Sequence, residues 1–270
     1  MWAMLPTAPT CAIMIATASE VTRLNILEQN RQSWNAMADT WFGSTALPVY
    51  GCLAPTEDEL HLFPPLEGAR VLDFGCGSGH SLRWCAAQGT SDLWGVDLSD
   101  KQIENANRLL TECGLKPHLL RMPMESLAGL PDGTFDVAYA VYAIGWTTDL
   151  DATLAGVYRA LKPGGMLIFS WDHPLMHCVD VVDEQLIFSG DYTQDETFSY
   201  TQRGKPVTIQ NRRLSTYINA LARAGFMIDR LIEETDDETK SRPAEFTSGY
   251  YAPWKARKFP LSFIIRARKV

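Results

Sequence analysis

A glycine-rich segment behind a short apolar run is the part of the sequence best suited to hold a ligand. The run 70–74 predicts a buried strand, and Gly75, Gly77 and Gly79 follow it at alternate positions. Glycines at such a turn let the backbone pass close to a bound molecule, and the helix predicted to follow offers free N–H groups. Asp97 ends the next predicted strand, where a carboxylate can accept hydrogen bonds from both hydroxyls of a ribose. Together these residues predict a nucleoside-binding site.

The details of this segment favour a cationic ligand over a pyrophosphate. Dinucleotide-binding turns have the spacing G-x-G-x-x-G, whereas this chain has G-x-G-x-G. Asp73 stands just before the first glycine, and a carboxylate there would repel a pyrophosphate. S-adenosylmethionine carries a ribose, an amino group and a sulfonium, but no phosphate. The residues therefore favour S-adenosylmethionine, and a nicotinamide-dependent oxidoreductase is the less favoured alternative.

The elements that must position these residues alternate between strand and helix. Strands are predicted over 70–74, 91–97, 117–121, 134–141 and 166–171, and helices over 78–88, 99–113 and 150–161. Ser99 and Gln102 have the spacing of a capping box at the start of one helix, and Pro163-Gly164-Gly165 predicts a turn. Strands joined by helices form parallel sheets with right-handed crossovers. The order of elements therefore predicts a doubly wound α/β domain.

The last third of the chain adds an insertion and two more strands. Residues 175–210 have the alternating pattern of β-structure. A helix over 213–224 is followed by strands over 226–232 and 261–267. Because the segment 233–260 is a polar loop with no apolar helix, these two strands are predicted to be antiparallel.

The N-terminal region predicts an extension followed by a helix. Residues 1–18 are apolar and end in Ala-Thr-Ala, but no Lys or Arg precedes them and Pro6 and Pro9 interrupt them, so a flexible extension over 1–21 is favoured over a secretory signal. Apolar residues then recur at helical spacing and predict a helix over 22–42. They are Leu24, Leu27, Trp34, Met37, Ala38 and Trp41.

Composition excludes several classes of protein. The chain has 270 residues, of which 32 are acidic and 24 basic, and a net charge of −8 argues against a nucleic-acid-binding protein. No segment other than the N-terminus approaches the ~20 apolar residues of a membrane span. The six cysteines form no C-x-x-C pair, which favours reduced thiols in a cytoplasmic protein over disulfides or zinc.

The chain resembles the class I S-adenosylmethionine-dependent methyltransferases of the UbiE-like small-molecule type. The resemblance covers about residues 31–270 and rests on five ordered segments: VLDFGCGSG (71–79), GVDLS (95–99), PDGTFDVAYA (131–140), LKPGG (161–165) and FPLSFIIRARK (259–269). It implies a Rossmann-like sheet of seven strands with the last one antiparallel, and S-adenosylmethionine as cofactor. It further implies a single domain over 22–270, with residues 22–65 as a helical lid and the insertion 175–210 as a substrate cap.

The resemblance also implies which residues contact the cofactor. Those expected to border its methionine part are Asp73, Gly75, Cys76, Gly77 and, through the backbone carbonyl, Ala140. Asp97 should hold the ribose hydroxyls and Leu98 should flank the adenine. Met124 and Glu125 fall where the family often has an acidic pair near the adenine amine, although here the acid comes one position later.

Aromatic residues of the predicted lid have two interpretations. Trp34 and Trp41 could belong to the core, as large apolar residues at helical spacing often do. Alternatively, they could face the sulfonium, to which an aromatic ring adds cation–π attraction. The second interpretation predicts Trp41 as a cofactor contact.

Methyl transfer from a sulfonium is a direct displacement, which depends mainly on alignment in a dry site. Candidates for the acceptor side are Tyr142 and Trp146 after the fourth strand and His173 after the fifth. His173 is the candidate base because imidazole titrates near neutrality, but it could equally be a loop histidine bonded to backbone. Arg212 could anchor an anionic substrate or only cover the sheet edge.

No metal is predicted. His173 and His177 are four residues apart, but Pro174 disfavours one helix through both and no carboxylate ligand accompanies them. The expected partner is therefore a small-molecule substrate alone. The alternative function is a protein of the same fold that binds S-adenosylmethionine without catalysis, because a fold does not determine an activity.

Overall fold

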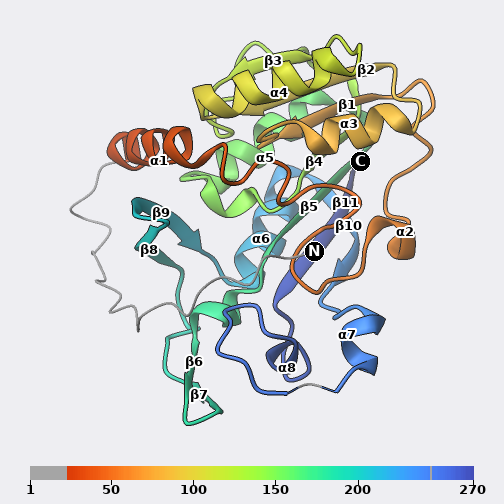
Figure 1. Ribbon diagram of the computed structural model, residues 1–270. Helices are drawn as coiled ribbons and strands as arrows, with labels where there is room; N and C mark the ends of the chain where they lie inside the picture. Colours follow the sequence, from red (N-terminus) through yellow and green to blue (C-terminus); the bar gives the residue numbers. More distant parts are fainter. Residues whose placement is uncertain (1–22, 244) are drawn as a thin grey trace.

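Seven strands form one twisted sheet at the centre of the computed structural model, which describes residues 23–243 and 245–270 (Figure 1). The strands are β1 (Arg70–Phe74), β2 (Asp92–Asp97), β3 (His118–Arg121), β4 (Phe135–Ala140), β5 (Leu161–Asp172), β10 (Phe226–Ile232) and β11 (Ser262–Lys269). Their order is β10-β11-β5-β4-β1-β2-β3. β11 runs antiparallel to both of its neighbours, and the other pairings are parallel. The predicted seven-stranded, mostly parallel sheet is confirmed. The predicted extension 1–21 lies outside the described residues.

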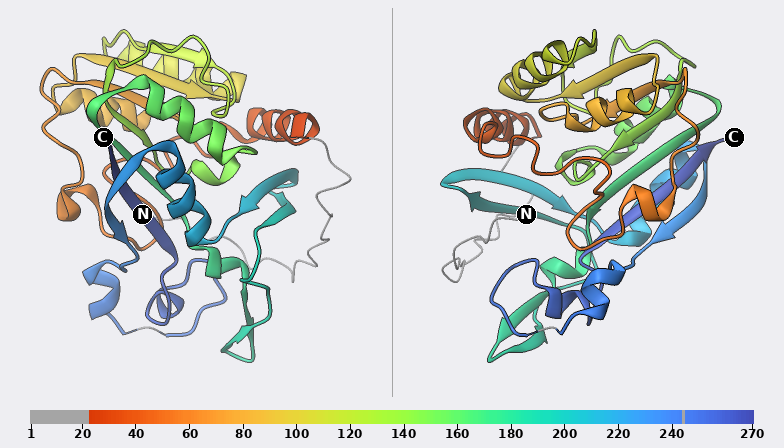
Figure 2. Two further views of the ribbon diagram at one scale, coloured as in Figure 1. Left: turned by 180° about the vertical axis from the view of Figure 1, so that it is seen from behind. Right: turned by 45° about the vertical axis from the view of Figure 1, so that its right-hand side comes forward.

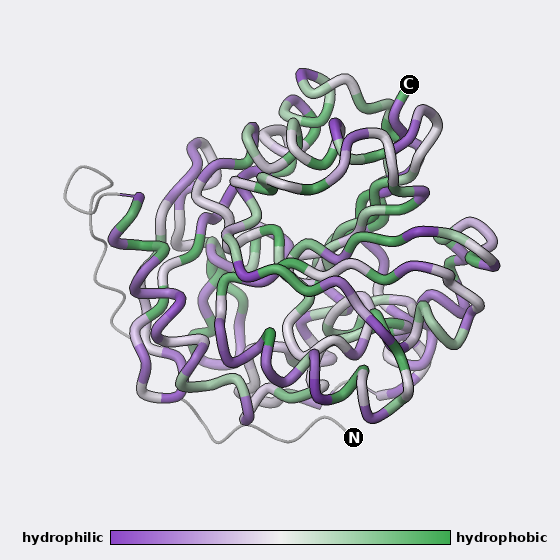
Figure 3. The backbone as a smooth tube through the Cα atoms, turned by 90° about the horizontal axis from the view of Figure 1, so that it is seen from above, coloured by the Kyte–Doolittle hydropathy of each residue, from purple (hydrophilic) through white to green (hydrophobic). Residues whose placement is uncertain are grey.

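Helices cover both faces of this sheet, which is why its strands are apolar on both sides. The helices α3 (His80–Ala87) and α4 (Asp100–Glu112) pack on one face, and α5 (Leu150–Ala160) and α6 (Leu214–Ala224) on the other (Figure 2). Val71 faces α3 and its neighbour Leu72 faces α5 and α6, because successive side chains of a strand point to opposite faces. Figure 3 shows hydrophobic stretches along the central strands.

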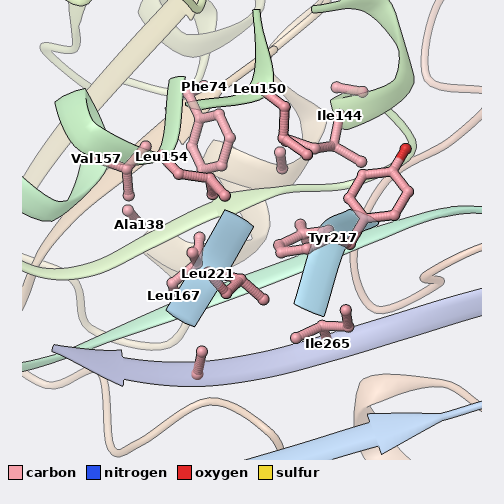
Figure 4. Close-up of a cluster of buried hydrophobic side chains, with 14 of the residues drawn as sticks. Phe74, Ala138, Ile144, Leu150, Leu154, Val157, Leu167, Tyr217, Leu221 and Ile265 are labelled. Carbon is pink, nitrogen blue, oxygen red and sulfur yellow. The ribbon is translucent and has the colours of Figure 1, made fainter. Parts of the chain in front are cut away.

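The α5 and α6 face holds the larger apolar cluster. Leu154 and Val157 of α5 and Leu221 of α6 meet Leu167 of β5 there (Figure 4). Removing a side chain of this kind from a close-packed core costs roughly 2–5 kcal/mol. The cluster therefore fixes the carboxyl ends of β4 and β5, where the functional residues begin.

The start of α4 departs from the predicted capping box. Ser99 Oγ accepts a hydrogen bond from the backbone N–H of Gln102 at 3.1 Å, as the pattern predicts. The reciprocal bond is absent, because Gln102 Oε1 has no hydrogen-bond partner among the described residues. The Gln102 side chain is therefore available for another role.

The N-terminal helix is shorter than predicted and buries a different face. α1 spans Arg23–Met37, and turns replace the helix predicted to continue to residue 42. Leu24, predicted to be on the apolar face, is 74% exposed, whereas Asn30 is buried. Asn30 pairs with the backbone of Thr208 in both directions, at 2.7 Å and 2.9 Å. Hydrophobic periodicity identified Met37, which is buried, but missed Asn30, because that part of the face is attached by hydrogen bonds of a polar side chain.

The predicted β-rich insertion consists of two hairpins. One pairs β6 (Val179–Val182) with β7 (Gln185–Phe188), and the other pairs β8 (Glu196–Gln202) with β9 (Lys205–Asn211). A 3₁₀ turn, η2 (Pro174–His177), connects β5 to the first hairpin. Strand β9 lies against α1, so two segments far apart in sequence form one layer (Figure 1).

Two other predictions need correction. The Pro163-Gly164-Gly165 turn lies within β5, where the pairing with β4 shifts between Phe135 and Val137. The segment 233–260 contains two short helices, α7 (Asp237–Ser241) and α8 (Pro253–Ala256), the second with Trp254 buried. The antiparallel pairing of β10 with β11 is nevertheless as predicted. One further short helix, α2 (Glu57–Leu60), precedes β1.

Candidate cofactor and acceptor site

A cavity enclosing about 1060 Å³, including its mouth open to solvent, lies at the carboxyl ends of β1, β2 and β4. This is the edge of an open α/β sheet at which ligands bind. Every residue predicted to contact the cofactor lines the cavity except Ala140: the lining includes Trp41, Asp73, Gly75, Cys76, Gly77, Asp97, Leu98, Met124 and Glu125. Ala140 is fully buried in the sheet opposite Phe169, and the residues that follow it line the cavity instead.

The glycine turn brings backbone to the cavity wall. Gly75 has a φ of +128°, and a Cβ there would lie 2.4 Å from the Cβ of Ala143. Gly77 has a φ of +49°, and its N–H donates to Asp97 Oδ2 at 2.9 Å. Residues that carry a side chain rarely adopt either backbone conformation. At Gly75 there is also no room for a Cβ atom. The turn after β1 is therefore locked to the end of β2.

Two carboxylates lie close together beside this turn, the buried Asp73 and the half-buried Asp97. Asp97 Oδ1 accepts from the backbone of Ser99 at 2.8 Å, and Asp97 Oδ2 from Gly77. Burial raises the pKa of Asp97 to about 6, although these backbone hydrogen bonds act against the rise. Asp73 is 2% exposed, and burial together with the charge of Asp97 raises the pKa of its carboxyl well above the usual range. A cation between them would relieve both effects.

Charge in the cavity has one sign. Asp73, Asp97 and Glu125 are acidic lining residues, and no Lys or Arg lines the cavity within the described ranges 23–243 and 245–270. Burial lowers the pKa of His80, the histidine on the wall, so it is neutral at pH 7. Glu125 Oε1 accepts from the backbone and the hydroxyl of Thr148, which holds its side chain at the wall.

Two buried polar atoms at the wall have no hydrogen-bond partner in the described part of the chain. They are Trp41 Nε1, a donor, and Gln102 Oε1, an acceptor. An unpaired buried polar group costs about 1–3 kcal/mol, so such groups indicate a missing partner. Gln102 was not among the predicted site residues, because its spacing from Ser99 is that of a helix-capping pair.

Aromatic rings from the N-terminal region close one side of the cavity. Trp34 of α1 packs edge-on against Trp146, with ring centroids 5.2 Å apart. Trp41 follows α1, and the guanidinium of Arg203, in the turn between β8 and β9, lies 4.9 Å from its ring centroid. Both tryptophans therefore line the cavity, as their interpretation as ligand contacts predicts.

Tyr142 and Trp146 lie on the cavity wall, as predicted for acceptor-side residues. Trp146 ends the 3₁₀ turn η1 (Ile144–Trp146). Tyr142 has a φ of +54°, which is rare for a large side chain. Its hydroxyl donates to Asp172 Oδ1 at 2.6 Å and lies 2.8 Å from Ser262 Oγ. Hydrogen bonds therefore hold the Tyr142 ring in a strained position at the carboxyl end of β4.

His173 is placed differently from the other predicted acceptor-side residues. It is 2% exposed and is not part of the cavity wall. Its Nδ1 accepts from the backbone N–H of Leu175, so Nε2 carries the proton and donates to Glu233 Oε1 at 2.7 Å. Burial lowers the pKa of His173 despite that carboxylate. This geometry gives His173 a role in connecting β5 to the segment after β10.

No group of three or more His, Cys, Asp or Glu side chains among the described residues is placed to hold a metal ion. Over the same residues, no helix has the length and hydropathy to cross a bilayer.

Comparisons with known proteins agree with this geometry. A family model described as "Methyltransferase domain" matches residues 72–169. An uncharacterized protein of Haemophilus influenzae is 31% identical over 225 residues, 78% of this chain and 85% of the relative. A ubiquinone biosynthesis O-methyltransferase of Bordetella avium is 29% identical over 162 residues, 58% of this chain and 66% of the relative.

A solved structure extends the match to most of the fold. The crystal structure of an S-adenosylmethionine-dependent methyltransferase from Mesorhizobium loti has a TM-score of 0.66 and 28% identity, and the match covers 78% of this chain and 95% of that one. The residues matched by the family model run from within β1 to within β5 and include the glycine turn, Asp73 and Asp97. The chain belongs to the class I S-adenosylmethionine-dependent methyltransferases.

Proposed function

We propose that the protein binds S-adenosylmethionine in this cavity and transfers its methyl group to a small-molecule acceptor by direct displacement. The observation that carries the proposal is the cavity charge: three carboxylates line it, and no Lys or Arg does so within the described residues. S-adenosylmethionine brings a sulfonium and an ammonium to such a site. The three carboxylates would repel a pyrophosphate. The net charge of −8 supports a small molecule over a nucleic acid as acceptor.

Each part of the cofactor has a suited partner on the wall. Asp97 accepts from the ribose hydroxyls, and the unpartnered Gln102 Oε1 can accept from one of them. Asp73 pairs with the amino group beside the glycine turn. Trp41 Nε1 donates to the carboxylate of the methionine part, and Leu98 and Met124 are the apolar contacts for the adenine.

Residues on the acceptor side of the cavity align the reactants and exclude water. When bound, S-adenosylmethionine supplies the electrophilic methyl group. Trp34 and Trp146 exclude water from that region and offer aromatic faces to the positive charge. Tyr142, fixed by Asp172, sets the position of the nucleophile. We do not assign His173 as the base, because its Nε2 is bonded to Glu233 away from the cavity.

Calorimetry followed by turnover tests the proposal. S-adenosylmethionine and S-adenosylhomocysteine should bind, and NADH should not. Release of S-adenosylhomocysteine is then measured with phenol, thiol, amine and quinone acceptors. Binding of NADH without binding of S-adenosylmethionine would overturn the cofactor assignment. Tight binding without turnover of any acceptor would instead support the non-catalytic alternative.

A further inference from the structure

Arg212 is a buried cation without an ionic partner. The residue is 8% exposed, follows β9, and donates from Nη2 to the carbonyl of Thr147 at 2.6 Å. Its Nη1 is buried and has no hydrogen-bond partner, and no carboxylate of the described chain forms an ion pair with it. A guanidinium stays charged at any physiological pH. Its burial is therefore costly unless an anion accompanies it.

The acidic residues in the neighbouring segments are already engaged. Asp149, two residues after Thr147, pairs with Arg23 and caps α5 through the Ala152 N–H. Asp195 accepts from the backbone and the guanidinium of Arg213. The charge of Arg212 helps to lower the pKa of Asp149, but neither neighbouring carboxylate forms an ion pair with the Arg212 guanidinium. We therefore expect the anion that pairs directly with Arg212 to come from outside the chain.

Two other buried donors lie around the same short segment, residues 145–147. Trp171 Nε1 has no partner within the described chain, and a Cβ on Gly145 would lie 2.2 Å from it. The Tyr217 hydroxyl is buried beside the Arg212 guanidinium and has no other hydrogen-bond partner within the described chain. Burial raises the pKa of Tyr217, and the nearby positive charge of Arg212 acts against that rise. Figure 4 shows Tyr217 beside Ile144, the first residue of η1.

This group of donors lies directly behind the acceptor side of the cavity wall rather than on it. Trp146, the residue before Thr147, lines the cavity and packs edge-on against Trp171 at a centroid distance of 5.8 Å. Trp34 also packs edge-on against the Trp146 ring. The acceptor side of the cavity is therefore walled by aromatic rings, and the unpaired guanidinium of Arg212 lies behind them.

We propose that Arg212 binds a carboxylate group of the methyl acceptor, which is thus an organic acid with a flat, apolar body. A carboxylate matches the planar guanidinium, and the free Nη1 supplies the hydrogen bond. Trp171 Nε1 and the Tyr217 hydroxyl are the further donors, and Tyr142 and Trp146 hold the apolar body next to the cofactor. This inference rests on the proposed methyl transfer and adds the chemical class of the acceptor.

Matched acid–amide pairs test the inference. Wild-type protein and S-adenosylmethionine are given hydroxybenzoates, aminobenzoates, hydroxycinnamates and aromatic amino acids, each beside its primary amide. Release of S-adenosylhomocysteine is measured. The best acid should exceed its amide in kcat/KM by at least about tenfold, the scale of one charge-assisted hydrogen bond. A panel in which no acid exceeds its amide overturns the inference.

Variants of Arg212 test whether this residue causes the preference for acids over amides. Arg212→Gln should reduce the acid-over-amide preference to about twofold or less and leave the affinity for S-adenosylmethionine unchanged, and Arg212→Lys should retain part of the preference. Arg213→Gln is the matched control, because Arg213 is adjacent but pairs with Asp195, and it should keep the full preference. An unchanged preference in Arg212→Gln would assign the effect elsewhere and overturn the inference.

The outcomes separate the two proposals. Failure of S-adenosylmethionine to bind the wild-type protein contradicts the proposed function. Normal cofactor binding and turnover with equal rates for acids and amides contradicts only the role of Arg212. If circular dichroism shows that Arg212→Gln does not fold, the comparison of acids with amides in the wild-type protein still tests the inference.

Discussion

At the scale of single residues, the negative charge of the cavity comes from carboxylates that have no Lys or Arg beside them on the described part of the wall. Asp97 uses both oxygens to fix the backbone around it, yet each oxygen keeps a lone pair for a ligand. Asp73 is buried behind the glycine turn, and no Lys or Arg of the described residues lies on the wall. A cationic ligand would thus balance the negative charge of these carboxylates. Substitutions here should therefore change the affinity for the cofactor more than the rate of methyl transfer.

Asp97→Ala should weaken binding of S-adenosylmethionine by about 1.5–3 kcal/mol, because it removes charge-assisted hydrogen bonds to the ribose. Calorimetry measures the change. Asp92→Ala is the matched control, since Asp92 lies at the other end of β2 and pairs with Arg70. Equal affinity in Asp97→Ala and the wild type would remove Asp97 from the site.

Affinity for S-adenosylmethionine should fall as the pH falls through about 6, the raised pKa of Asp97. Only the ionised carboxylate accepts from both hydroxyls, so affinity should decrease by up to about tenfold per pH unit below that value. Titrations between pH 5 and 8 check this, and Asp97→Asn should remove the dependence. In the free protein the raised pKa acts the other way: stability from this group is full below the unfolded pKa and is lost as the pH rises through 6.

Gln102→Leu should weaken cofactor binding by about 1 kcal/mol, because it removes an unpartnered acceptor from the cavity wall while keeping the volume of the side chain. Gln88→Leu, at the end of α3, serves as the control. Improved affinity in Gln102→Leu would show that the amide does not meet the ligand.

At the scale of elements, α1 and the β8–β9 hairpin form one layer over the cavity. Asn30 joins them through the backbone of Thr208, and Ser33 Oγ donates to the carbonyl of Pro206 at 2.5 Å. Trp34 of the same helix reaches Trp146 on the acceptor side. The lid and the cap expected from sequence are therefore physically connected, and loosening one should loosen the other.

Asn30→Ala should leave the N–H and carbonyl of Thr208 without side-chain partners, at a cost of roughly 1–3 kcal/mol. We expect faster dissociation of S-adenosylmethionine, measured by stopped flow, and faster tryptic cleavage in α1. Gln32→Ala is the control, because Gln32 bonds only to Glu28 within the helix. If both variants release the cofactor at the wild-type rate, the layer does not govern access.

At the scale of the whole molecule, the sequence predicted the sheet more completely than the layer above it. Alternating strands and helices, and a polar segment between the last two strands, are local patterns that predict a mostly parallel sheet with an antiparallel final pair. The attachment of α1 depends on Asn30 and Thr208, 178 residues apart. His173 was predicted as a base, but its partner Glu233 is 60 residues away. No local pattern identifies such polar pairs.

Cofactor binding should stabilise the entire fold. At a concentration 100 times its Kd, S-adenosylmethionine should raise the free energy of unfolding by about 2.7 kcal/mol. Thermal unfolding should then shift upward by roughly 5–10 °C. NADH at the same concentration should leave the midpoint unchanged, and an equal shift with NADH would contradict selectivity for a cation.

The strand order carries a consequence for biosynthesis. β11 is the last strand in sequence, yet it lies between β5 and β10. While the ribosome is still adding β11, the edges of β5 and β10 that will pair with it expose unpaired backbone N–H and C=O groups. Such edges promote aggregation and attract chaperones. Completion of the sheet must therefore wait for β11, and a premature stop before residue 262 would leave β10 separated from β5 and the facing edge of β5 unpaired.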